Sequence, residues 1–149
     1  MATINTVFER LKGFSLMDAA MDAAMEHKED FLKTHKAQLY ERGERKDGRK
    51  LRRYANPFYA DMKHEMNPQV GLGNPDLFLT GAFMNSRFIR KTGEDVFEFG
   101  ATDEKTEMLE VKYGLGSTVL GLSDESKQKA CDDFYRDAVL EKVHERTKL

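Results

Sequence analysis

Three asparagine-proline pairs within one short stretch constrain this fold more than any other feature. Asn56-Pro57, Asn67-Pro68 and Asn74-Pro75 contain all three prolines of the chain. Proline has no backbone N–H and disfavours helical geometry at the residue before it, so each pair argues against a continuous helix or a central strand. Residues 54–76 are therefore expected to form a long, irregular linker, with a helical turn at residues 58–65. Long loops of this kind often carry function or disorder.

The segments on either side of the linker show helical patterns. A capping box opened by Thr6 predicts a short helix over residues 6–12. A second capping box opened by Ser15 begins a longer helix that is expected to reach about residues 40–42. Ser123 caps a predicted final helix, whose apolar stripe consists of Ala130, Phe134, Ala138, Val139 and Val143.

A small sheet is expected between the linker and the final helix. Residues 86–91 and 96–99 flank a short turn that contains Gly93, a pattern typical of an antiparallel hairpin. Thr102 or Asp103 can then cap a further helix, and residues 115–120 are expected to form a third short strand or an extended link.

These patterns predict one α+β domain over residues 1–149, a length that fits a single domain. A small antiparallel sheet would pack against a long N-terminal helix and a C-terminal helix, with an extended linker loop. The predicted divisions are an N-terminal helical region at residues 1–42, the basic loop and linker at 43–76, and the sheet with the C-terminal helix at 77–149.

Composition excludes several classes of protein. Charged residues make up 34% of the chain while the net charge is only −2, so no overall field marks a nucleic-acid or membrane partner. The longest apolar runs are a few residues, which excludes a transmembrane helix, and the first residues do not resemble a secretory signal. Cys131 is the only cysteine, which excludes an internal disulfide and a thiolate metal cluster.

No residue pattern indicates catalysis. The four histidines lack metal-ligand spacing and are expected to be exposed or partly buried polar side chains: His27, His35, His64 and His144. Cys131 is expected to be a small buried side chain, and no serine lies in a nucleophile elbow. We therefore nominate no catalytic, cofactor-binding or metal-binding residue and expect a protein that is not an enzyme.

Two segments carry opposite charge. Residues 42–53 contain seven basic and two acidic residues, and residues 94–112 contain seven acidic and two basic residues. Opposite patches permit head-to-tail association of copies, which forms a ring when the rotation closes. Two solvated faces that never meet are an equal alternative. The basic loop would also suit weak, salt-dependent DNA binding.

The segment of residues 76–86 is apolar, contains glycine and lacks a catalytic group, so we interpret it as a docking element. The candidate interface residues are Arg45, Lys46, Arg49, Lys50, Arg52, Arg53, Leu77, Phe78, Leu79, Phe83, Glu104, Glu107 and Glu110.

The order of several short motifs resembles the virion morphogenesis and tail-completion (head–tail connector) proteins of tailed bacteriophages. The likeness spans residues 39–143 and consists of Asp47-Gly48, Tyr59-Ala60-Asp61-Met62-Lys63, the segment of residues 76–86, Phe99-Gly100 and Leu120-Gly121-Leu122-Ser123. The resemblance implies a non-enzymatic building block that oligomerises around the portal, neck or tail axis. The expected location is the virion, after synthesis in the host cytoplasm. The expected partners are other copies of this chain and neighbouring portal, neck or tail proteins. The alternative function is that of a small nucleic-acid-binding accessory protein acting through residues 42–53.

Overall fold

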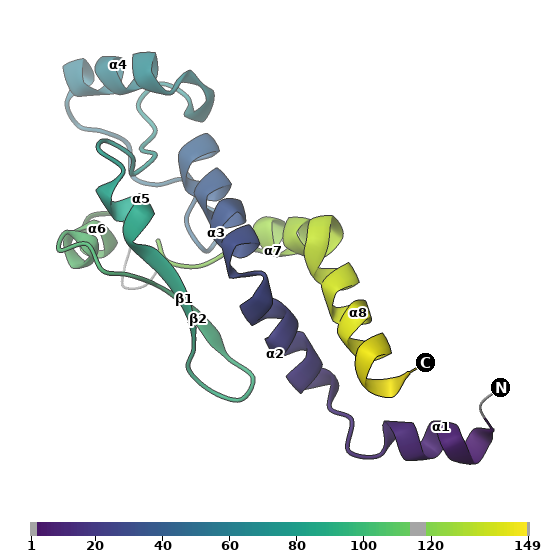
Figure 1. The fold of residues 1–149 in the computed structure, drawn as a ribbon. Coiled ribbons are helices and arrows are strands. Elements are labelled where there is room, and N and C mark those ends of the chain that lie inside the picture. The colour runs from purple at the N-terminus through teal and green to yellow at the C-terminus, as the bar shows by residue number, and fades with distance from the viewer. Residues whose placement is uncertain (1–2, 114–118, 149) are drawn as a thin grey trace.

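The computed structural model describes residues 3–113 and 119–148. Its N-terminal part is a short helix followed by a long helical rod (Figure 1). The short helix, α1, spans Ile4–Leu11, so it begins two residues before the predicted start. The prediction of Thr6 as the cap was wrong, because the Thr3 hydroxyl accepts the hydrogen bond from the Thr6 N–H.

The rod consists of α2 (Leu16–Glu26), α3 (Lys28–Lys36) and a π-helical turn, η1 (Ala37–Glu41). Ser15 caps α2 through the Asp18 N–H, as predicted, and the rod ends within the expected range. The sequence predicted a single helix, whereas the structure interrupts it at His27, where φ is −106° and ψ is 27°.

The linker is more ordered than the sequence indicated. The predicted helical turn is present as α4 (Pro57–Met66), and a 3₁₀ turn, η2, follows over Pro68–Val70. Asn56 caps α4 by accepting from two backbone N–H groups, and Pro57 occupies the first helical position, where its missing N–H costs nothing.

The predicted hairpin is confirmed. A short helix, α5 (Ala82–Ser86), leads into β1 (Arg87–Lys91), which pairs antiparallel with β2 (Phe97–Ala101). The next helix, α6 (Thr106–Tyr113), begins after the predicted cap at Thr102 or Asp103. The predicted strand or link at residues 115–120 lies mostly outside the described residues.

The C-terminal helical segment comprises α7 (Asp124–Ala130), a π-helical turn η3 (Cys131–Tyr135) and α8 (Arg136–Thr147). Ser123 caps α7 as predicted. In Figure 1, α8 runs alongside α2 while the hairpin lies on the other side of the rod. The Lys142 ammonium lies 2.5 Å from the Glu26 carboxylate across the helix pair. The predicted α+β class, with a small antiparallel sheet and helices from both ends of the chain, is confirmed.

Two apolar clusters hold these elements together. One joins the rod, the hairpin and α7, and its buried members are Ala24, Phe31, Ile89, Leu122 and Ala130. The other lies beneath the basic loop and α5, and its buried members are Leu39, Leu51, Phe83, Met84 and Val119. Phe31 and Leu39 place the rod in both clusters, so the rod supports both the hairpin and the basic loop.

Candidate assembly surfaces

The basic loop, residues 42–53, neutralises part of its own charge. Arg45 forms an ion pair with Asp47, and the hydrogen bond from Arg45 is the main reason that the Asp47 pKa is lowered to about 2. Arg42 and Lys50 both approach the Glu44 carboxylate, at 3.4 and 3.9 Å. The net positive charge remains, but less of it is available to a partner than the sequence suggested.

The remaining predicted residues of the loop fall into two groups. The Arg53 guanidinium donates to the Leu72 carbonyl at 2.7 Å, which ties the loop to the end of the linker. Lys46, Arg49 and Arg52 are exposed, and within residues 3–113 and 119–148 their side chains make no hydrogen bond or ion pair. These three cations are the part of the loop that can contact a partner.

The predicted docking element packs mainly against its own subunit. Asp76 is buried and forms an ion pair of 2.8 Å with Lys63 of α4. The Asp76 carboxylate also accepts from the Asn67 amide at 2.9 Å and from the Phe78 backbone N–H at 3.0 Å. The Lys63 ammonium donates to the Phe78 carbonyl as well. These bonds fasten the linker and α4 to the segment that precedes α5.

This internal packing corrects the predicted interface. Phe83 is buried in the core, so its side chain is not at the surface, and Leu77 and Phe78 are half-buried against the core, so each offers only part of its side chain to another subunit. Phe78 contacts the Tyr40 ring edge to face, with 5.3 Å between ring centroids. Of the four predicted apolar residues, only Leu79 is exposed.

The predicted acidic residues also separate. Glu104 lies just before α6 and Glu107 lies in its first turn, and both are exposed. Glu110 is buried, and its carboxylate accepts the backbone N–H groups of Val119 and Leu120 at 3.2 and 2.9 Å. The prediction of Glu110 as an interface residue was therefore wrong, because this side chain bonds a segment of its own chain.

A pair of buried polar residues on the rod was missed by the sequence analysis. His35 is fully buried, whereas the sequence analysis expected an exposed or partly buried side chain. A guanidinium can only donate, so the 2.7 Å contact from Arg87 makes His35 Nδ1 an acceptor, and the Nε2 N–H donates to the Val119 carbonyl at 2.8 Å. Burial, together with the Arg87 charge, lowers the His35 pKa to about 3. The ring is therefore neutral.

Gln38 continues this polar joint one turn later. Its amide nitrogen donates to the Gly121 carbonyl at 3.0 Å, and its oxygen accepts from the Ser123 N–H at 2.8 Å. His35 and Gln38 thus fix the backbone that leads into α7. The backbone groups that they bond lie more than eighty residues away, so no local pattern could have indicated this role.

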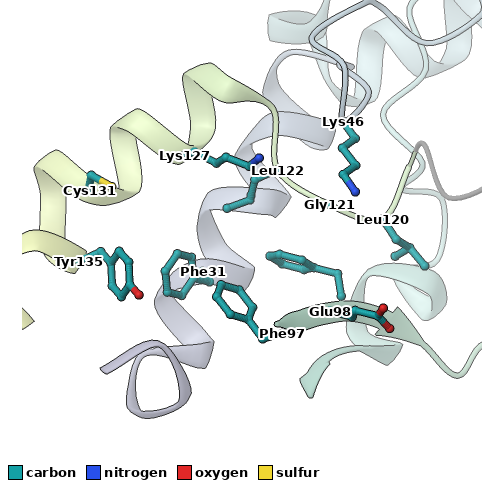
Figure 2. A pocket seen from close by; sticks show the side chains of 11 residues that line it. Phe31, Lys46, Phe97, Glu98, Leu120, Gly121, Leu122, Lys127, Cys131 and Tyr135 are labelled. Carbon is teal, nitrogen blue, oxygen red and sulfur yellow. The ribbon is translucent and has the colours of Figure 1, made fainter. Parts of the chain in front are cut away.

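A hollow with a volume of about 510 Å³ lies between β2, α3 and the start of the C-terminal helices. The side chains of Phe31, Phe97 and Tyr135 lie close together in it, while Lys46 reaches down from the basic loop (Figure 2). Cys131 also lines the hollow and is half-buried, which is more exposed than predicted. Burial raises the Tyr135 pKa, so the phenol keeps its proton. The aromatic part of the hollow suits an apolar group, and Lys46, Glu98 and Lys127 also line it.

Several helices expose large apolar side chains to solvent, and α1 and α4 each carry three of them. The α1 face consists of Ile4, Phe8 and Leu11, and Phe8 is 67% exposed. The α4 face consists of Phe58, Met62 and Met66, and Phe58 is 83% exposed. The four-residue spacing of the α4 face was the signal that sequence reasoning overlooked.

The chemistry available to the chain is otherwise limited. Within residues 3–113 and 119–148, no group of three or more histidine, cysteine or acidic residues is placed to hold a metal ion. In the same residues, none of the helices combines the length and apolar character needed to cross a membrane. Comparisons with protein-family models, curated proteins and solved structures found no match for this chain.

Proposed function

We propose that this protein is a structural subunit of a tailed-bacteriophage particle, which forms a ring and acts as an adaptor or completion factor at the head–tail junction or the tail. The observation that carries the proposal is the exposure of large apolar side chains on both the α1 face and the α4 face. Monomeric proteins rarely leave such patches uncovered, and patches of this kind mark association sites. The motif order described above supplies the phage context.

The proposed mechanism is recognition without chemistry. The rod, the hairpin and α8 form the supporting body, and the two exposed helix faces contact other copies or neighbouring portal, neck or tail proteins. The buried Lys63–Asp76 pair holds α4 in place on this body, so its exposed face keeps a defined orientation. Complementary shape and charge then decide the partner.

The test is mass spectrometry of gradient-purified phage particles, with the copy number of this protein per particle. A copy number that is a multiple of six or twelve is expected for a ring around the tail axis. Sedimentation of the pure protein, alone and with portal or tail proteins, provides the second measurement. The proposal would be refuted if the protein stays monomeric both alone and with portal or tail proteins and is also missing from the particles.

A second candidate function is nucleic-acid binding through Lys46, Arg49 and Arg52, which the exposure of these three cations favours. Replacing all three with alanine is then expected to weaken DNA binding and to reduce its salt dependence by roughly one phosphate contact per residue. Arg45→Ala is the matched control, because Arg45 is already paired with Asp47. Binding that does not respond to salt would remove this candidate.

A further inference from the structure

The α1 face and the α4 face lie at opposite ends of the molecule. In Figure 1 the two helices project from the body at the far ends of the rod. On the opposite side of α4, Ala60 and Lys63 are buried, so the α4 face points away from the body. One copy therefore cannot cover its α4 face with its own α1 face, and each face needs a partner from elsewhere.

The two faces carry opposite charges at their edges. The C-terminal end of α1 carries two cations, Arg10 and Lys12, and one carboxylate, Glu9, so its net charge is positive. With 100° of rotation per residue, Asp61 and Glu65 border the α4 face. All of these side chains are exposed or half-exposed; Glu9 lies 3.5 Å from Lys12, and Arg10 donates to the Lys148 carbonyl at 3.2 Å. The net charge beside the α1 face is thus positive and that beside the α4 face is negative, so the two faces attract each other and repel their own kind.

We propose that the α1 face of one copy docks on the α4 face of the next copy. Two α1 faces or two α4 faces would place like charges together, whereas the mixed pairing brings cations to carboxylates around an apolar centre. The contact is heterologous, so every added copy again offers one free face of each type. Such chains end in a ring when the rotation closes and in a filament when it does not. This inference rests on the proposed function and names its self-contact.

Two single substitutions test the contact. Phe8→Glu places a carboxylate in the α1 face, and Met62→Glu does the same in the α4 face. Both side chains are exposed, so circular dichroism should show unchanged folding. Each variant is expected to weaken self-association by roughly tenfold or more, measured by sedimentation velocity over a concentration series. Leu140→Glu is the matched control, because Leu140 is also exposed on a helix but belongs to neither face.

Mixing the two variants distinguishes this arrangement from symmetric pairing. The Phe8→Glu chain keeps a normal α4 face, and the Met62→Glu chain keeps a normal α1 face. Their mixture is therefore expected to form a one-to-one dimer that neither variant forms alone and that grows no further. Association that survives in either variant alone, or a mixture without dimers, would overturn the inference.

The proposed function is tested by a different measurement from the α1–α4 contact. A wild-type protein that does not self-associate overturns the α1–α4 contact, and the copy number in purified particles still decides whether the protein is a virion component. Conversely, a head-to-tail oligomer that is missing from particles keeps the contact and removes the phage assignment.

Discussion

Replacing Lys63 with methionine removes one half of a buried ion pair and is expected to lower the free energy of unfolding by about 3–5 kcal/mol. The side chains of Lys63 and Asp76 are only 5% and 2% exposed, and their charged atoms lie 2.8 Å apart. Methionine keeps most of the volume of the lysine stem, so the loss comes from the Asp76 charge that stays buried without its counter-ion. The Phe78 carbonyl also loses a donor.

The measurement is urea-induced unfolding followed by circular dichroism. Lys129→Met is the matched control, because Lys129 makes an exposed ion pair with Asp133 at 3.2 Å. Exposed pairs of this type contribute about 1 kcal/mol or less, so the control should stay within that range of the wild type. Any larger effect of Lys63→Met can then be assigned to burial.

A double substitution identifies the origin of the loss. The Lys63→Met/Asp76→Asn chain holds no buried charge at this site, and asparagine can still accept the Phe78 N–H bond. This double variant is expected to be more stable than Lys63→Met alone, because no carboxylate remains without a counter-ion. A loss of less than about 1 kcal/mol in Lys63→Met, or strictly additive losses in the double variant, would refute the reasoning.

Three further outcomes follow from the structure. The folded-state pKa of His35 is lowered to about 3, so between pH 6.5 and 3 the unfolded chain binds a proton that the folded chain does not. The free energy of unfolding should therefore fall as the pH drops from 6.5 toward 3, by at most about 5 kcal/mol. His35→Gln should flatten this slope when the urea midpoint is measured over a series of acidic pH values. In Gly43→Ala the new Cβ would lie 2.6 Å from the Pro75 carbonyl oxygen, so this variant should lose about 1–3 kcal/mol more folding stability than Gly48→Ala. Gly48 is the matched control, because its φ is also positive and a Cβ there would meet open space; equal melting temperatures of the two variants would contradict this. Ser123→Ala removes the α7 cap and should cost about 1 kcal/mol in urea unfolding, and an unchanged midpoint would argue against the cap.

The parts of the fold that sequence predicts are those set by neighbouring residues. Ser15 and Ser123 cap helices because each hydroxyl meets a backbone N–H three residues later, a distance that the sequence shows directly. The hairpin is equally local, since its strands adjoin their turn. Thr6 shows the limit of such patterns, because Thr3 and not Thr6 is the N-cap of α1.

The parts that sequence does not predict depend on distant partners. The buried position of His35 follows from Val119 and Arg87, and that of Glu110 from backbone groups beyond the end of its helix. The sequence alone does not distinguish a polar residue that is buried from one at the surface, because burial depends on partners that are distant in sequence. For this reason the candidate interface gained buried residues such as Phe83 and Glu110 and omitted the exposed α4 face.

The pairing of α2 with α8 places a condition on the timing of biosynthesis. Lys142 and Arg146 of α8 reach back 116 and 124 residues to Glu26 and Asp22. A nascent chain on the ribosome thus holds α2 without the helix that covers it while the 116 residues from Glu26 to Lys142 are made, and contacts this distant in sequence are slow to form. Subunits can acquire their final shape only after α8 has emerged, so the supply of competent copies is set by the synthesis of α8 and not by the first appearance of α1.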